Sequence, residues 1–359
     1  MNLNDVKIEK TLNSDISSPF QTLASPPISL RRAQCVVYNY EILICGSYDS
    51  KECYSYHTIK NQYKYICSYP KNVVSFGHCV VSLGDSNQNE ITLLSFGGQP
   101  RNQRKHTLVM KYISVWDNEI TDSNPLNKWV ALRNNDGKEI IIGRYEDDYQ
   151  GVKAIIGGSN DHLLFVTYHP KNIDVFDLNT LKYINFYILP TDGYIKHQCF
   201  LSADKHCNHM LLFSKSKGLS IEYDEQRNIF QFHEMRVCAA MRSLCSFGHV
   251  YINGCILFFG GEDGFNYSMK DNKWTISVQN WPTALRGCIT VLNDDNTFMH
   301  ILGQSDENYR ISIHLKTKID EWMEIEQRWI EENKEILEAE DIRAELEQMK
   351  RELDINKLN

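Results

Sequence analysis

The sequence predicts an all-β fold, a six-bladed β-propeller with four-stranded blades, followed by a long C-terminal amphipathic α-helix. Three observations lead to this prediction. A short apolar run, in its clearest copies ended by glycine, recurs along the chain; a pair of aromatic residues follows most of these runs; and the units repeat about every 50 residues. Strand-like runs repeated at that interval are typical of propeller blades and not of helical solenoids.

The apolar runs are the first observation. The two clearest copies are residues 93–98 and 256–261, and each ends in a glycine pair, Gly97-Gly98 or Gly260-Gly261. Such a run predicts a strand buried on both faces, followed by a turn that needs positive φ or close backbone approach. Weaker copies occur at residues 42–46, 163–166, 210–213 and 299–303, and the two central ones have lost the glycines.

The aromatic pairs are the second observation. In four units, six residues separate the two rings: Tyr56 and Tyr63, Phe176 and Tyr183, Tyr223 and Phe230, Tyr267 and Trp274. The second unit has Trp116 and Trp129 around an insertion near residues 119–124, and the sixth has only Trp322. We expect Trp129 and Trp274 to pack between blades. Asparagine precedes the second aromatic by two residues in four units, which predicts left-handed turns at Asn61, Asn127, Asn228 and Asn272.

An apolar strand, a glycine pair and then Tyr-x6-Trp resembles the kelch repeat, most fully in the unit of Gly260, Gly261, Tyr267 and Trp274. The resemblance covers residues 19–322 and implies a kelch-type propeller. It also implies that the N-terminal strand around Phe20 completes the last blade and hides an edge that could pair with other chains. The alternative is that Trp322 begins that outer strand and Phe20 is peripheral.

The ends of the chain differ from the repeat. Residues 1–18 are expected to form a flexible segment. Residues 323–359 are expected to form an acidic amphipathic helix with the potential to pair as a coiled coil, because polar helix formers dominate there and apolar residues recur at heptad-like spacings. Its apolar stripe predicts an association element that docks on the propeller flank, on a partner or on a second copy.

Charge and cysteine usage narrow the classes of partner and compartment. Residues 318–359 hold 14 of the 46 acidic residues and 7 of the 38 basic ones, so the rest of the chain is nearly neutral. Nucleic acid is therefore an unexpected ligand. The 11 cysteines are odd in number and dispersed, and no apolar run is long enough for a membrane span. A reduced cytoplasmic protein is the simplest interpretation.

The residues that could carry chemistry point to no enzyme class. His197, Cys199, His206, Cys207 and His209 are the one metal-like cluster, but their spacing differs from known zinc motifs, so neither a metal nor a cofactor is predicted. His78 and His249 occupy matching positions and are expected to be framework residues. Kelch-like propellers include a copper radical oxidase and sugar-modifying enzymes, so a small-molecule or carbohydrate-acting enzyme of the sugar oxidase or epimerase type is the alternative function.

The favoured function is a non-catalytic protein–protein interaction scaffold. In propellers that resemble this one, partners meet the loops between second and third strands and between blades. Arginine and tyrosine are enriched at binding hot spots. The candidate contacts on those loops are Arg32, Arg104, Arg144, Tyr194, Arg242 and Arg286. Neither the partner nor its pathway follows from the sequence.

Overall fold

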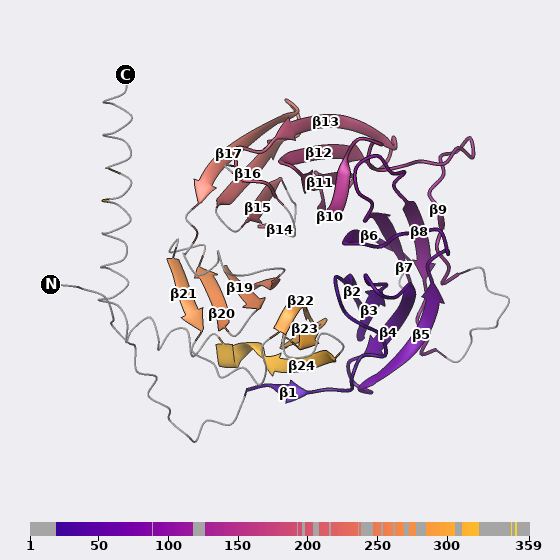
Figure 1. The fold of residues 1–359 in the computed structure, drawn as a ribbon, viewed down its shortest axis with the longest axis vertical. Coiled ribbons are helices and arrows are strands. Elements are labelled where there is room, and N and C mark those ends of the chain that lie inside the picture. The colour runs from indigo at the N-terminus through magenta and orange to yellow at the C-terminus, as the bar shows by residue number, and fades with distance from the viewer. Residues whose placement is uncertain are drawn as a thin grey trace.

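The computed structural model describes the strands of a closed ring (Figure 1). The described residues are 19–87, 89–117, 126–191, 193–195, 198–203, 208–214, 217–235, 237, 247–252, 254–260, 263–268, 273–277, 285–305, 311–322, 346 and 349. Within these residues the chain forms six four-stranded antiparallel sheets. Alternating apolar residues and β-branched or aromatic side chains favour strands, because they fit a pleated surface that packs on both sides.

Five of the sheets are each built from four strands that follow one another in the chain, which run from the axis outward. The first three are β2 (Cys35–Tyr38), β3 (Glu41–Cys45), β4 (Glu52–His57) and β5 (Gln62–Ser68); β6 (His78–Asn87), β7 (Glu90–Gly97), β8 (Thr107–Tyr112) and β9 (Val130–Ala131); and β10 (Asp148–Gly157), β11 (Leu163–His169), β12 (Asn172–Asp177) and β13 (Lys182–Ile188). The next two are β14 (Cys199–Ser202), β15 (His209–Phe213), β16 (Gly218–Asp224) and β17 (Ile229–Met235); and β18 (Gly248–Ile252), β19 (Cys255–Gly260), β20 (Asp263–Ser268) and β21 (Lys273–Ser277).

The remaining sheet is composite and closes the ring. Its inner strands are β22 (Leu285–Leu292), β23 (Phe298–Ser305) and β24 (Ser312–Lys318), and its outer strand is β1 (Gln21–Thr22). In the antiparallel register Gln21 faces Lys316 and Thr22 faces Leu315. Closure by the N-terminal strand is thus confirmed, and β24 has no free edge along this pairing.

The expected fold class needs two corrections. Five blades, not six, consist of four consecutive strands, because the chain is cut within the last sheet and its two ends share that sheet. The expected long C-terminal helix is not part of the described fold, which contains one short helical segment at residues 319–322. Apart from Leu346 and Met349, the range 323–359 assigned to that helix lies outside the described residues.

Trp322, in the short helical segment, belongs to the packed ring. Its ring lies edge-on to Phe20, with centroids 5.6 Å apart, and edge-on to Phe259 of β19 at 5.2 Å. Its indole N–H donates to Thr317 Oγ1 at 2.9 Å. Because Trp322 is buried among residues of two sheets, the helical segment seals the joint at which the ring closes.

The core consists of the apolar faces between neighbouring sheets. The second strand from the axis is almost wholly buried in β3, β11 and β19. β7 is the second strand of its sheet; Gly97 ends it and Gly98 follows directly. Both have positive φ, and a Cβ on Gly97 would lie 2.7 Å from Val152 Cγ1 on β10. The first glycine pair therefore permits close approach between the second and third sheets. In the second pair, Gly260 ends β19 and Gly261 lies outside the described residues.

Candidate functional site

The propeller has two unlike faces, because each sheet is a strictly antiparallel meander. Turns between first and second strands and between third and fourth strands lie at one end of the axis. Loops between second and third strands, and the connections between sheets, lie at the other end. We call the first end the turn face and the second the loop face. Longer connections on a rigid scaffold are where binding residues concentrate, so the loop face is the first candidate.

The turn face is made of tight left-handed turns, as the asparagine pattern predicted for two of its residues. Asn61 and Asn228 have φ of 51° and 56°. Each side chain accepts a hydrogen bond from a tyrosine of the preceding strand, Tyr56 OH to Asn61 Oδ1 at 3.0 Å and Tyr223 OH to Asn228 Oδ1 at 2.5 Å. Asn127, before β9, also has positive φ, whereas Asn272 lies outside the described residues. These asparagines are therefore framework residues.

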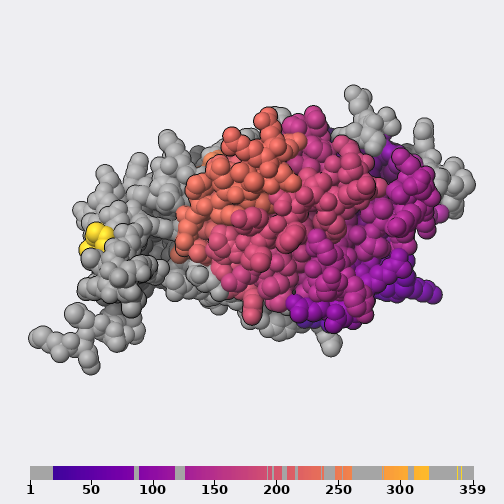
Figure 2. Space-filling model, turned by 90° about the horizontal axis from the view of Figure 1, so that it is seen from above, coloured from indigo at the N-terminus to yellow at the C-terminus, as the bar shows by residue number. Residues whose placement is uncertain are grey.

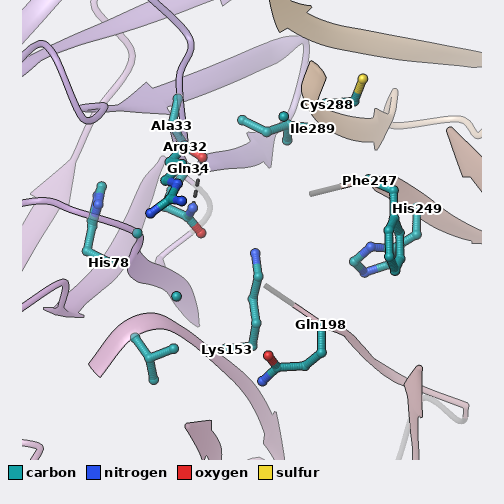
Figure 3. A pocket seen from close by; sticks show the side chains of 14 residues that line it. Arg32, Ala33, Gln34, His78, Lys153, Gln198, Phe247, His249, Cys288 and Ile289 are labelled. Carbon is teal, nitrogen blue, oxygen red and sulfur yellow. Dashed lines mark hydrogen bonds between the residues drawn. The ribbon is translucent and has the colours of Figure 1, made fainter. Parts of the chain in front are cut away.

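A pocket lies on the propeller axis, where one short segment from each of the six sheets converges (Figure 3). Each segment belongs to an innermost strand or to the residues just before it. The pocket holds about 480 Å³ of empty space, including the part open to bulk water. The lining side chains include Arg32, Gln34, His78, Lys153, Gln198, Phe247, His249, Cys288 and Ile289. No carboxylate is among the described lining residues.

Three polar atoms at this pocket have no hydrogen-bond partner among the described residues. They are Arg32 Nη1, Gln198 Oε1 and His249 Nδ1. An unsatisfied buried polar group costs on the order of 1–3 kcal/mol, so three of them in one place are a substantial local cost. Clusters of this kind are typical of sites that a ligand or ordered water completes.

The two histidines of the pocket differ in how they are held. His78 is buried, with Nε2 2.9 Å from the Cys45 carbonyl oxygen and Nδ1 3.1 Å from that of Ser75. These contacts tie β6 to β3, which confirms the framework role expected for His78. His249 has an unpartnered Nδ1, so its framework role is incomplete. Burial, and then the charge of Lys153, lowers the pKa of His249 to about 3.

The loop face presents large apolar side chains from several sheets. Their exposed fractions range from 42% to 74%, and they come from loops after β3, β5, β9, β13 and β23: Tyr48, Val74, Tyr145, Tyr194 and Ile311. Near the axis Arg31 lies over the Tyr48 ring at 4.3 Å and Arg32 lies over Phe76 at 4.2 Å. The two rings meet edge-on at 4.6 Å, so cations and aromatics alternate in one cluster.

These loops are held by hydrogen bonds. The Tyr48 amide donates to the Arg31 carbonyl at 2.8 Å, and Ser75 Oγ donates to the Ser47 carbonyl at 2.8 Å. Gln99 Nε2 donates to the carbonyl of Val74 at 2.6 Å. The aromatic and apolar side chains of the first two sheets are therefore displayed on fixed backbone.

The six sequence-predicted contacts are distributed over different environments. Arg32 lines the axial pocket, and Tyr194 is 74% exposed on the loop face. Arg104 is also on a loop, where its guanidinium lies 2.9 Å from Glu139. Arg242 lies outside the described residues, and Arg286 lies on β22 with its side chain outside them. Of the four whose side chains are described, Arg32 is the one that lines the axial pocket.

Arg144 forms part of a buried polar network. It lies 2.8 Å from Asp174 Oδ2 and 3.2 Å from the Tyr168 hydroxyl oxygen, and its guanidinium lies over Tyr183 at 4.5 Å. Burial raises the pKa of Asp174 to about 6, while the Arg144 charge acts in the opposite direction. Removing one member of such a pair leaves an uncompensated buried charge, so a structural role accounts for this arginine.

The histidine and cysteine cluster of the sequence falls mostly outside the described residues. Of its five members only Cys199 and His209 are described. Cys199 is buried in an apolar cluster, and His209 Nε2 lies 2.7 Å from Ser220 Oγ. Across the part of the chain that the structure describes, no three His, Cys, Asp or Glu side chains are placed to hold a metal ion.

The outer rim carries a second apolar surface, viewed in Figure 2 with the third and fourth sheets in front. It centres on β13, whose exposed large apolar residues are Ile184, Phe186, Tyr187 and Ile188. Asn185 Nδ2 donates to the Asn228 carbonyl at 2.7 Å, and Tyr187 lies 5.4 Å from Phe232, so β13 and β17 present one continuous flank.

No helix among the described residues is long and apolar enough to cross a membrane.

Sequence reasoning missed Lys153, Gln198 and His249 as one group. All three lie near the first regularly paired residues of the innermost strand of their sheet. That shared position was a usable signal, because the innermost strands of a propeller start near the axis. Lys153 faces Thr167 in the β10–β11 register, and Gln198 and His249 lie beside the first residues of β14 and β18. The register needed to align them becomes visible only once the sheets are formed.

Comparison with known proteins bears on the fold alone. No family model and no curated protein matches the sequence. Among solved structures the chain is similar to YjhT, with a TM-score of 0.57 and 10% identity over 81% of this chain and 95% of that one. It is also similar to a protein of unknown function from Bacteroides thetaiotaomicron, with a TM-score of 0.52 and 10% identity over 83% and 75% of the two chains. The chain therefore has the β-propeller fold, and its resemblance to kelch repeats stays a prediction.

Proposed function

We propose that this protein is a non-catalytic interaction scaffold that binds a protein partner through its loop face. The observation that carries the proposal is the set of exposed apolar side chains on loops of several sheets around one end of the axis. Surfaces that mix exposed aromatics and arginines are enriched at protein–protein contacts. The hydrogen-bonded loops of the first two sheets would reduce the ordering cost of association.

The turn face also exposes large apolar side chains, in turns or near strand ends: Tyr40, Ile59, Val130, Ile229 and Tyr251. Lys60 and Lys64 lie over the Trp116 ring at that end. The loop face is preferred because its connections are longer and because Arg31 and Phe76 lie close to Tyr48 near the axis.

A matched pair of double variants tests the proposal in the full-length protein. Tyr145→Ala with Tyr194→Ala changes the loop face at positions 61% and 74% exposed. Tyr40→Ala with Ile59→Ala changes the turn face at positions 56% and 71% exposed. Because all four are solvent-exposed, both variants are expected to keep the thermal stability of the parent.

The assay is quantitative affinity capture from the native cell, followed by direct binding of each captured protein to purified variants. A partner should bind the turn-face variant like the parent and the loop-face variant about 30-fold more weakly for each hot-spot tyrosine lost, on the order of 2 kcal/mol. A parallel sample lacking residues 325–359 separates loop-face binding from tail binding. Equal binding to both double variants would refute the proposal.

A further inference from the structure

The axial pocket carries a net positive charge that no described residue neutralises. Arg32 and Lys153 are its charged side chains, and neither forms an ion pair or hydrogen bond with a described residue. In Figure 3 the Lys153 side chain extends into the middle of the pocket, between Arg32 and His249. Arg32 and Lys153 are half-buried, and an arginine and a lysine that face one cavity without a carboxylate favour an anionic ligand.

The remaining titratable groups of the pocket leave this charge unchanged near neutral pH. Burial lowers the pKa of both His78 and His249; the Lys153 ammonium lowers the pKa of His249 further, while the contacts of His78 with the Cys45 and Ser75 carbonyl oxygens act in the opposite direction. Burial raises the pKa of the Cys288 thiol to about 12. Both imidazoles and the thiol are therefore neutral, and the pocket presents two positive charges.

The Gln198 side chain adds a preference for a hydroxyl group on the ligand. Gln198 donates Nε2–H to Thr167 Oγ1 at 2.9 Å, which fixes its amide and leaves Oε1 without a donor. The opposite amide assignment would leave its N–H₂ group unpaired in the same place, so one end of the amide faces the pocket in either case. A ligand hydroxyl can satisfy either end, because it both donates and accepts.

The backbone at both cationic residues is fixed before any ligand arrives. Arg32 has a left-handed φ of 56°, and its guanidinium carbon lies 4.2 Å from the centre of the Phe76 ring. Its Nη1 has no hydrogen-bond partner. Lys153 lies on β10 in regular pairing with Thr167 of β11. A planar guanidinium matches the two oxygens of a carboxylate or phosphate, and the lysine adds a point charge opposite.

We propose that the axial pocket is a binding site for a small hydroxylated oxyanion, a carboxylate or phosphate group on a short polyol. Arg32 and Lys153 hold the anionic group, and Gln198 and His249 meet the hydroxyls. The site adjoins the loop-face surface, because Arg32 lines the pocket and also lies over Phe76. The proposal does not depend on the existence of a protein partner.

Three probes of one carbon skeleton test the site by calorimetric titration of the full-length protein at low ionic strength. Glycerol 3-phosphate and glycerate carry the anionic group, and glycerol lacks it. We expect at least one anion to bind with a 1:1 stoichiometry and glycerol to show no binding at the same concentrations. The stronger of the two anions identifies the phosphate or the carboxylate as the preferred group. Inorganic phosphate should bind more weakly than glycerol 3-phosphate, because it has no carbon-borne hydroxyls for Gln198.

The decisive variant is Lys153→Met, which keeps the length of the side chain and removes the charge. Anion affinity should fall at least tenfold, while Lys182→Met, at an exposed position on the outer strand β13, should bind like the parent. Because Lys153 has no described partner, the variant should unfold at or above the temperature of the parent. Absence of anion binding to the parent, or equal anion affinity in Lys153→Met and the parent, would overturn the proposal.

Discussion

Trp129 offers the sharpest test of how the blades are held together. It lies directly before β9 and is 6% exposed. Its ring stacks on Tyr69 with centroids 4.8 Å apart and an interplanar angle of 14°. Its indole N–H donates to Cys53 Sγ on β4 at 3.4 Å. One side chain thus joins the outer part of the second sheet to the first.

Replacing Trp129 by alanine should lower the free energy of unfolding by about 3–5 kcal/mol, since the indole is almost fully buried and its neighbours cannot fully collapse into the space. The expected contributions are the lost burial, an aromatic stacking term of about 0.5–1.5 kcal/mol, and a hydrogen bond of about 1 kcal/mol. Trp129→Phe keeps a stacked ring and removes the N–H donor. It should cost roughly 1–2 kcal/mol by loss of that bond and some area.

Urea unfolding at equilibrium, followed by circular dichroism, measures both variants against the parent. The midpoint should move down in the order parent, Trp129→Phe, Trp129→Ala, with the slope against denaturant unchanged. A free energy of unfolding for Trp129→Ala within about 1 kcal/mol of the parent, at equal slope, would refute the reasoning. In that case the indole would not be part of the packing between the first two sheets.

Four further outcomes follow from the fold. Deleting residues 1–24 should lower the free energy of unfolding, measured by thermal denaturation, by about 3–6 kcal/mol, since it removes β1 and its buried flanking side chains. Deleting residues 1–17 should change it little. Gly97→Ala should lower urea stability by about 2–5 kcal/mol through positive φ and a 2.7 Å contact, and Gly84→Ala, with positive φ in open space, by about 1–2 kcal/mol. In urea titrations, the free energy of unfolding should decrease as the pH is lowered from 6 to 4, by about 1.4 kcal/mol per pH unit for each histidine whose pKa is lowered to about 3 or 4, because the unfolded chain takes up those protons first. Asp174, with its pKa raised to about 6, takes up one proton in the folded state and opposes this decrease. A flat profile would contradict the burial of His106, His249 and His300. Deleting residues 325–359 should leave the ring folded, and light scattering on both proteins then reports whether the tail self-associates; loss of folding would place the tail in the core.

The repeat could be predicted where local chemistry dictates local geometry. Asn61, Asn127 and Asn228 adopt the left-handed turns that their spacing indicated, and Trp129 is buried as the aromatic rule required. Closure by the N-terminal strand was predictable because the segment around Phe20 matches an outer strand that the last sheet lacks. The side chain of Trp274 lies outside the described residues, so its packing role stays a prediction.

The site could not be predicted in the same way, because it is assembled by register between distant strands. Arg144 lies on a loop like any binding arginine, but its partner Asp174 is 30 residues away and becomes a neighbour only when β12 pairs. Lys153 stands in a sheet whose glycine markers are missing, so its position at the axis was hidden. Trp322 fits a helical heptad in sequence, but Phe20 and Phe259 bury it within the ring.

The shared sheet of β1 and β24 has a consequence for the order in which this protein is made. The Leu30 amide donates to Ser312 Oγ across 282 residues of chain, and the β1 pairing spans a similar separation. At roughly 5–20 residues per second, a ribosome needs about 15–60 s to supply the partner of a strand that emerged first. During that interval the consecutive sheets can form one after another, while the first segment waits with its backbone groups unpaired. The last sheet is therefore the step most exposed to mispairing between nascent chains, and slow translation would lengthen that exposure.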